Sequence, residues 1–266
     1  MVTTEFGLII AGLFLVALLY SSVGHGGGSG YLAILSLTSY GTMEVAWLKQ
    51  YAWCLNLIVA GVAFWHYSRA GHHMREMTVP LVVASVPFAL VGGYLRVDGA
   101  LYDTLLSVTL VWAAWRLLLI KRDFVGVGVG PPELREALPV GGAIGLVSGV
   151  IGVGGGIFLS PVVLLRRWAT PKAAAATAAA FIWLNSAAGL AGAGLSGQLQ
   201  IELEILGSFG IAVLFGGLAG SRYGADMAPQ TLVRNLLVVV LLVAASRRVL
   251  SAVSYTHLTL PTICSV

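Results

Sequence analysis

Long apolar segments recur along the whole chain, and they restrict its fold more than any other feature. They cover residues 6–22, 30–39, 47–65, 78–95, 101–120, 138–151, 157–165, 173–193, 203–221 and 231–246. Most are close to the length of about 20 residues that crosses the hydrocarbon core of a bilayer. Charged residues make up only 10% of the chain, whereas soluble domains carry about 25%. The sequence therefore predicts a polytopic membrane protein.

The segments are predicted to be helices rather than barrel strands. Backbone inside lipid must satisfy its own hydrogen bonds, which leaves helices or closed barrels. Barrel strands alternate between apolar and polar residues, but these segments are continuously apolar. The net charge of +4 gives no indication of a nucleic-acid partner. Cys54 and Cys264 form neither a disulfide framework nor a metal pattern, so no cofactor is predicted.

Three sequence similarities between the two halves indicate an internal repeat. The stretch "GHGGG" at 24–28 returns as "GVGGG" at 152–156, and Asn56 in "WCLNL" returns as Asn185 in "IWLNS". A third pair, "ALVGGYL" and "VLFGGLA", follows in the same order. Matches in one order at nearly constant spacing indicate a duplicated unit. The fold class is thus predicted to be all-α, with two repeats of about five helical segments and 8–10 membrane segments.

The distribution of charge predicts that the two repeats are inverted relative to each other. The loops at 66–77, 121–136 and 166–172 hold eight of the fifteen Lys and Arg residues, whereas the loop at 194–204 holds none. The positive-inside rule places the three basic loops in the cytoplasm. Each repeat then begins with a glycine-rich broken-helix hairpin, the first entered from outside and the second from the cytoplasm. Inverted repeats of this kind are typical of secondary transporters.

The chain divides into four predicted regions. The first transmembrane repeat covers 1–120, a cytoplasmic linker covers 121–137, and the second transmembrane repeat covers 138–250. The tail at 251–266 is rich in Ser and Thr and has no periodicity. It is interpreted as a disordered or non-native tail that is not part of the membrane fold.

The glycine-rich stretches allow three interpretations. A nucleotide-binding loop is disfavoured, because neither stretch completes a phosphate-binding glycine motif. Close packing of helices suits scattered pairs such as Gly92-Gly93, but three consecutive glycines disrupt a helix instead. The third interpretation is a pair of broken helices near the membrane midplane. Their glycine amides form an anion nest, and the helices that follow point their positive ends at the same place.

Polar side chains within apolar segments are candidate site residues, because they are costly in lipid. His25 is a candidate to bind an anion or carry a proton, and the alternative is a ring bonded to a nearby carbonyl. Lys49 is a candidate too, with snorkelling to the interface as its alternative. The predicted substrate-binding residues are Gly24, His25, Gly26, Gly27, Gly28, Gly152, Gly154, Gly155, Gly156, Lys49, Gln50, Asn56, Thr177 and Asn185.

Enzymatic and metal chemistry are both disfavoured by the sequence. His66, His72 and His73 lie close together, but with Arg69 and Arg75 they are better explained as an interfacial loop than as a metal site. The apolar segments hold neither a Ser-His-Asp grouping nor paired carboxylates nor zinc-ligand spacing. The sequence therefore predicts that the protein is not an enzyme.

Two stretches resemble the sulfite exporter TauE/SafE family of membrane transporters. They are "GLVSGVIGVGGGIFLSPVVLL" followed by "TPKAAAATAAAFIWLNSAAGLAG", and the more degenerate "LYSSVGHGGGSGYLAIL" of the first half. The resemblance covers about residues 6–250. The first copy departs from the second, with Ala33 in place of Pro161 and Lys49-Gln50 near the counterpart of Thr177. The resemblance implies an inner-membrane exporter of small anions, commonly sulfite, sulfonates or related organic acids.

The resulting hypothesis is a secondary carrier that works by alternating access and holds its anion between the two glycine-rich loops. Its expected partners are a small anionic substrate, the lipid bilayer and, as a candidate coupling ion, the proton. Two alternatives remain open at this point. One is a non-transporting membrane scaffold or accessory subunit in which the glycines only pack helices, and the other is an anion channel.

Overall fold

The computed structural model describes residues 2–97, 104, 108, 130–233, 235 and 236. Its helices are α1 (Val2–Ser21), α2 (Gly28–Ser36), α3 (Val45–Arg69), α4 (Arg75–Tyr94), α6 (Leu134–Ile151), α7 (Gly156–Leu165), α8 (Pro171–Leu195) and α9 (Leu203–Arg222). A 3-10 helix, η1 (Ser39–Thr42), precedes α3, and a π-helical turn, η2 (Tyr223–Met227), follows α9. The described residues thus show the all-α fold that the sequence predicts.

Six of the described helices are long and apolar enough to cross a membrane. They are α1, α3, α4, α6, α8 and α9, and the shorter α7 is apolar as well. The apolar segment expected at 138–151 is longer in the structure, because α6 already begins at Leu134 and reaches 18 residues. Its first turn contains charged residues that the sequence predicts to lie in the linker.

Because six described helices can cross a membrane, the chain is a multi-pass membrane protein.

Several predicted regions lie wholly or largely outside the described residues. They are the apolar segments 101–120 and 231–246, most of the linker 121–137, and the tail 251–266 with Cys264. The predictions for these regions stay predictions.

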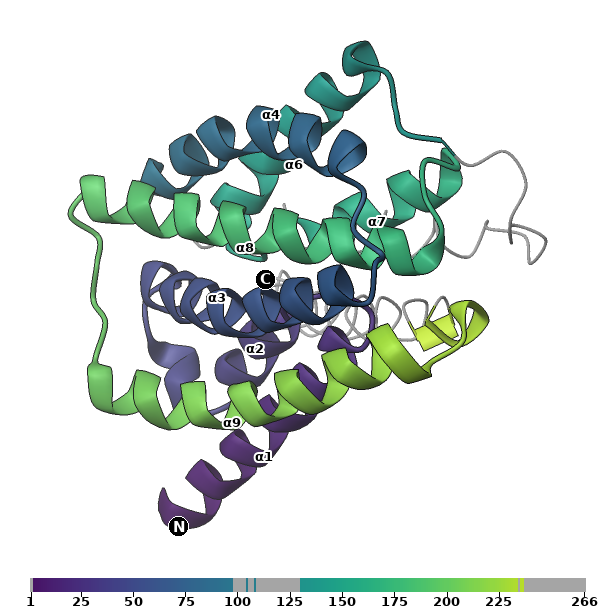
Figure 1. Ribbon diagram of the computed structural model, residues 1–266. Coiled ribbons are helices and arrows are strands. Elements are labelled where there is room, and N and C mark those ends of the chain that lie inside the picture. The colour runs from purple at the N-terminus through teal and green to yellow at the C-terminus, as the bar shows by residue number, and fades with distance from the viewer. Residues whose placement is uncertain (1, 98–103, 105–107, 109–129, 234, 237–266) are drawn as a thin grey trace, which may run out of the picture.

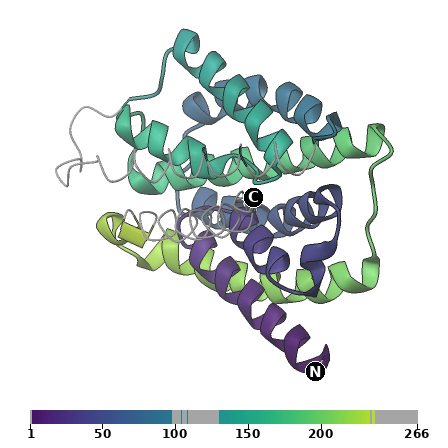
Figure 2. The ribbon, with the colours of Figure 1, turned by 180° about the vertical axis from the view of Figure 1, so that it is seen from behind.

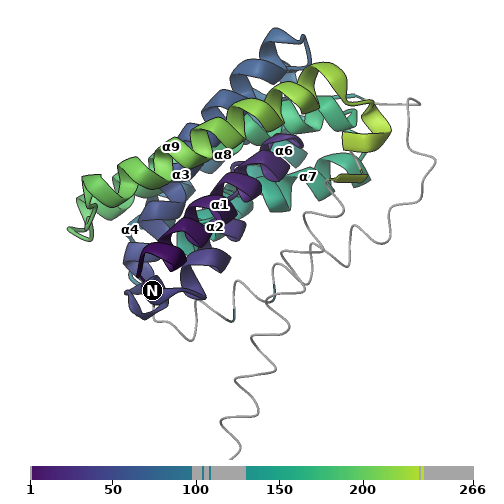
Figure 3. The same ribbon diagram turned by 90° about the horizontal axis from the view of Figure 1, so that it is seen from below.

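The long helices pack in a row with α3 and α8 at its centre. On one side α8 packs against α4, and α4 against α6; on the other side α3 packs against α9, and α9 against α1. Figure 1 shows this order from α6 and α4 at the top to α1 at the bottom, and the view from behind repeats it (Figure 2). Seen from below, α1 and α9 run along one common direction (Figure 3).

The order of helices in this row has an internal symmetry. If each helix is exchanged for its counterpart in the other half of the chain (α1 for α6, α3 for α8, α4 for α9), the row reads the same from the opposite end. Such pairing is the arrangement expected of a duplicated unit. It supports the repeat predicted from the glycine-rich stretches, while the inversion of one half in the membrane stays a prediction.

Close packing between the halves depends on small residues. A side chain on Gly93 of α4 would collide with the backbone of Gly189 on α8, and one on Gly216 of α9 would collide with the backbone of Phe14 on α1. Small residues let membrane helices approach until their backbones touch. The scattered glycine pairs thus pack helices, and they differ in this respect from the glycine-rich stretches.

The two short helices α2 and α7 follow the glycine-rich stretches directly. The residue that precedes each of them, Gly27 for α2 and Gly155 for α7, has left-handed backbone dihedrals. Each helix therefore starts again after a true break in the chain instead of continuing the helix before it. A newly started helix presents free N–H groups and the positive end of its dipole.

Candidate functional site

The two glycine-rich loops match in backbone conformation at two positions and differ at a third, where Gly154 has a φ of 76° and the equivalent Gly26 has no positive φ. Gly24 and Gly152, which occupy the same position in the two stretches, have φ angles of 74° and 88°. Gly27 and Gly155 match in the same way, with φ angles of 99° and 86°. Left-handed backbone is unfavourable for residues with a Cβ, which explains why glycine stands at these positions. The loops are therefore repeated in three dimensions as well as in sequence.

The loops meet each other in the interior of the bundle. A Cβ on Gly154 would lie 2.7 Å from Ile182 and 3.0 Å from the side-chain nitrogen of Asn56. A Cβ on Gly26 would lie 3.0 Å from the same Ile182 and would also strike the carboxamide of Asn56. Both loops therefore pack against one isoleucine of α8 and one asparagine of α3. The starts of α2 and α7 converge on this place.

His25 links the two loops directly. Its ring is 2% exposed, with Nδ1 3.0 Å from the carbonyl oxygen of Val23 and Nε2 3.3 Å from the hydroxyl of Ser160 on α7. A carbonyl oxygen only accepts, so Nδ1 donates there, and in the neutral ring Nε2 accepts from Ser160. A serine hydroxyl can either donate or accept. The link can therefore persist when the ring gains a proton.

The equivalent asparagines Asn56 and Asn185 each bring one unpartnered polar atom to the interior. Asn56 donates from Nδ2 to the hydroxyl of Ser186 over 3.4 Å, and its Oδ1 has no partner. Asn185 accepts at Oδ1 from the hydroxyl of Ser85 over 2.8 Å, and its Nδ2 has no partner. An unsatisfied buried polar group costs about 1–3 kcal/mol. Such atoms are good candidates for contacts with a ligand.

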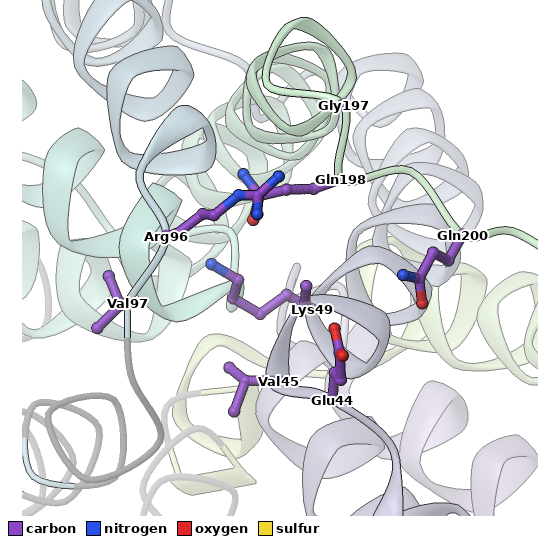
Figure 4. A pocket seen from close by; sticks show the side chains of 9 residues that line it. Glu44, Val45, Lys49, Arg96, Val97, Gly197, Gln198 and Gln200 are labelled. Carbon is purple, nitrogen blue, oxygen red and sulfur yellow. The ribbon is translucent and has the colours of Figure 1, made fainter.

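A cavity of about 310 Å³ opens beside the second loop. It is lined by Glu44, Val45, Ala46, Lys49, Arg96, Val97, Gly197, Gln198 and Gln200. Figure 4 shows the basic ends of Lys49 and Arg96 turned toward the same space. The start of α3, the end of α4 and the connection from α8 to α9 form its walls. By the predicted topology this is the outer side of the membrane.

Lys49 connects this cavity with the second loop. Its ammonium donates to the carbonyl oxygen of Val150 over 3.2 Å, and a Cβ on Gly152 would lie 2.8 Å from its Cγ. Lys49 is only 3% exposed. The ion pairs among the described residues, Arg135–Glu133 and Arg166–Glu136, do not include it. A buried cation without a carboxylate partner is costly, and a bound anion would offset that cost.

Two of the predicted site residues lie away from the loops. Gln50 donates to the backbone carbonyl of Gln198 over 2.6 Å and accepts from the backbone N–H of Gln200, so it holds the α8–α9 connection. Thr177 shares a hydrogen bond of 2.8 Å with Thr78 on α4, which ties α8 to α4. The structure thus groups Asn56, His25 and Lys49 with the loops, whereas the hydrogen bond of Asn185, like that of Thr177, goes to α4.

Three residues at the site were missed by the sequence analysis. Ser160 and Ile182 have ordinary side chains in apolar segments, so neither is distinctive in sequence. Ile182, however, lies three residues before Asn185 on α8, at the spacing of one helix face. Only Arg96 has a signal in the sequence, because a basic residue is unusual in a loop predicted to lie outside the membrane.

The fold and the site define a class of protein: a helical membrane protein with two broken helices meeting inside the bundle. The chain belongs to the sulfite exporter TauE/SafE family, whose model matches residues 8–248. It is 33% identical over 245 residues to the "Probable membrane transporter protein y4hK" of Sinorhizobium fredii (strain NBRC 101917 / NGR234), covering 91% of this chain and 97% of the relative. The protein is therefore a membrane transporter. No solved structure matches the chain.

Proposed function

We propose that the chain is a secondary carrier that exports small anions, with sulfite, sulfonates and related organic acids as its substrate class. The family description names sulfite, and the site offers what a small oxyanion needs. A small oxyanion is bound by several N–H donors and a positive potential in a place with little space for water.

The observation that carries the proposal is the meeting of the two loops. Both run up to Asn56 and Ile182, and a new helix starts from each of them. Two helix N-termini directed at one place attract an anion without a cationic side chain there. The unpartnered Nδ2 of Asn185 adds a further buried donor on α8.

The cavity beside Lys49 and Arg96 is proposed as the approach to this place from one side. Basic residues at the mouth of a cleft raise the local concentration of anions. The ammonium of Lys49 donates to the carbonyl of Val150, which lies two residues before the second loop. The stem of the Lys49 side chain packs against Gly152, the first residue of that loop. An anion bound to the ammonium would therefore lie close to the second loop. Movement of one half of the row against the other would then open the site to the opposite side.

The proton is proposed as the coupling ion, with His25 as its carrier. The ring is buried between the loops and bonded to both halves of the chain, through Val23 and Ser160. Protonation would add a positive charge beside the proposed anion position. An anion and a proton that bind together would move in the same direction, so export would require that the outward anion gradient exceed any inward proton gradient.

Flux measurements in proteoliposomes test the proposal. The purified full-length chain is reconstituted, and uptake of sulfite, sulfoacetate and chloride is measured with and without a pH gradient. We expect saturable flux of sulfite or sulfoacetate that responds to the gradient, and its loss in the Gly27→Leu and Gly155→Leu variants.

Two outcomes would contradict the proposal, and each favours one alternative. Flux that rises linearly with anion concentration and ignores the gradient indicates a channel. No flux of any of the three anions, together with no anion-induced rise in melting temperature, indicates a scaffold or accessory subunit, because ligand binding stabilises the folded state by mass action.

A further inference from the structure

A second cavity, of about 550 Å³, lies apart from the glycine-rich loops, at the far end of α3 from Lys49. It is lined by Gly61, Phe64, Trp65, Ser68, Arg69, His73, Arg75 and Trp183. None of these residues belongs to the proposed anion site. The cavity includes residues of α3, the start of α4 and the middle of α8.

The residues of α3 that line the cavity lie on one face of the helix. They are Gly61, Phe64, Trp65, Ser68 and Arg69, and their spacing of three and four residues is that of a single helix face. From Gly61 to Arg69 the helix rises about 12 Å at 1.5 Å per residue. The cavity is therefore an elongated groove along α3, with glycine at one end and arginine at the other.

One end of the groove is basic and contains unsatisfied polar atoms. Arg69 and Arg75 are both exposed, and the ion pairs among the described residues involve neither of them. The hydroxyl of Ser68 and Nε2 of His73 are buried without a hydrogen-bond partner. Burial and the neighbouring Arg75 lower the pKa of His73, which favours a neutral ring. Two guanidinium groups and two further unpartnered polar atoms thus gather within one turn of the end of α3.

The other end of the groove is aromatic and apolar. Trp65 and Trp183 are 50% and 40% exposed, and in a membrane-spanning bundle their exposed faces meet lipid. The indole of Trp183 passes close to Gly61, where a Cβ would lie only 3.2 Å from its Nε1. The guanidinium of Arg69 lies 5.0 Å from the centre of the Trp65 ring, between the two ends. The groove thus changes from basic to apolar along the direction in which a lipid lies.

We infer that this groove is a binding site for one anionic phospholipid, with the headgroup phosphate at Arg69 and Arg75 and an acyl chain along Trp65 and Trp183. The phosphate oxygens would accept from the Ser68 hydroxyl and from the ring N–H of His73. The loop that contains His73 and Arg75 is predicted to be cytoplasmic, and basic pockets between membrane helices on that side bind anionic headgroups.

The apolar end of the groove favours a lipid over a free anion. A phosphate or a small transported anion would occupy only the basic end, and would make no contact with the tryptophans of α3 and α8. A phospholipid matches both ends at once, in the order in which the structure presents them. The inference stands independently of the proposed transport function, because it depends on different residues and a different ligand.

Lipid binding is measured on the purified full-length chain by native mass spectrometry and by thermal shift. The probes are phosphatidylglycerol and phosphatidylcholine with the same acyl chains, and inorganic phosphate. We expect phosphatidylglycerol to bind more tightly than phosphatidylcholine. Arg69→Gln and Arg75→Gln should each weaken the binding of phosphatidylglycerol about fivefold. Each basic residue near the membrane surface contributes about 1 kcal/mol to the attraction of anionic lipid, which corresponds to that factor. Ser68→Val should weaken it about tenfold, through loss of a hydrogen bond to a charged group.

Arg135→Gln is the matched control, since Arg135 is also an exposed arginine in a region predicted to be cytoplasmic, but lies outside the groove. It should bind phosphatidylglycerol as the unmodified chain does. Equal binding of phosphatidylglycerol by the Arg69→Gln, Arg75→Gln and Arg135→Gln variants would overturn the inference. So would displacement of the lipid by inorganic phosphate, because it would show a site for free anions.

Discussion

The two glycine-rich loops share left-handed glycines at two equivalent positions but differ in the side chains around them. Both begin and end on left-handed glycines, Gly24 and Gly27 in the first and Gly152 and Gly155 in the second. The first loop contains His25 where the second has Val153. The two loops therefore share left-handed glycines at these two positions, while their side chains differ in chemistry.

The divergence has a direction, because side chains of the first half serve the second loop. His25 reaches Ser160 on α7, and Lys49 of α3 packs against Gly152 and bonds the carbonyl of Val150. The first loop, by contrast, is backed at Gly24 by the backbone of Ala175 on α8. A symmetric backbone frame thus holds asymmetric side chains, and substitutions in the two loops can separate the contributions of frame and side chains.

The largest effect is expected where the two loops are alike. Alanine at Gly27 or Gly155 meets a left-handed backbone, which costs about 1–2 kcal/mol. Its Cβ would also lie 2.6 Å from the Tyr31 ring in the first case and 2.8 Å from Phe181 in the second. Both variants displace the start of a short helix, and misplacement by about 1 Å reduces rates by roughly 100-fold in well-ordered sites. We expect such a loss of anion flux in both, measured in proteoliposomes.

Gly71→Ala is the control for this pair of variants. Gly71 also has a left-handed backbone, with φ of 78°, but a Cβ there would meet nothing within 4 Å. It should lose a comparable amount of stability from backbone strain while its flux stays within about twofold of the unmodified chain. If only one of the two loop variants loses flux, the loops do not contribute equally, and the symmetric frame is wrong.

A smaller effect, on stability, should separate Gly24→Ala from Gly152→Ala. The backbone strain is similar in both. A Cβ on Gly24 collides with the backbone of Ala175, which cannot move alone, whereas a Cβ on Gly152 approaches Lys49 less closely, 2.8 Å from its Cγ and 3.2 Å from its Cα. Overpacking against a fixed neighbour adds about 1–3 kcal/mol. Gly24→Ala should therefore lower the melting temperature more, and equal losses in a thermal-shift assay would refute the proposed difference.

The class of fold followed from the sequence because apolar length and charge are direct physical constraints. A segment such as 173–193 has few ways to be satisfied other than as a membrane helix, and the structure has α8 at Pro171–Leu195. The glycine-rich loops followed as well, because consecutive glycines disrupt a helix wherever they occur. The start of α6 at Leu134 did not, since its charged first turn resembles a linker in composition.

The partners of the site residues were harder to predict, because they depend on packing between distant segments. Asn56 and Asn185 stood out as polar residues in apolar segments, but only Asn56 packs against both glycine-rich loops, while Asn185 bonds Ser85 on α4. Gln50 stood out for the same reason, yet it holds the α8–α9 connection. Residue type alone does not tell which face of a helix a side chain occupies. Ser160 was overlooked for the converse reason, since only the three-dimensional structure brings it to His25.

Lys49→Gln tests the asymmetry on the side of the cavity. Removing the ammonium should weaken the apparent affinity for sulfite about tenfold, the value of one hydrogen bond to a charged group. Lys172→Gln is its control. Lys172 is also a buried lysine that donates to a backbone carbonyl, that of Ala225, but it lies outside the cavity. Both variants should lose stability, and only Lys49→Gln should raise the sulfite concentration for half-maximal flux. Equal affinities for sulfite in the two variants would show that Lys49 does not interact with the transported anion.

The smallest effect is expected from making the first loop resemble the second. His25→Val removes both the ring and its hydrogen bond to Ser160, and Ser160→Ala removes the hydrogen bond alone. Each should slow flux about fivefold, in line with about 1 kcal/mol for one hydrogen bond. Only His25→Val should also abolish the response to a pH gradient, because only it removes the group that carries a proton. A response that survives in His25→Val would show that the proton moves elsewhere, and that the divergence of the loops at this position affects their packing alone.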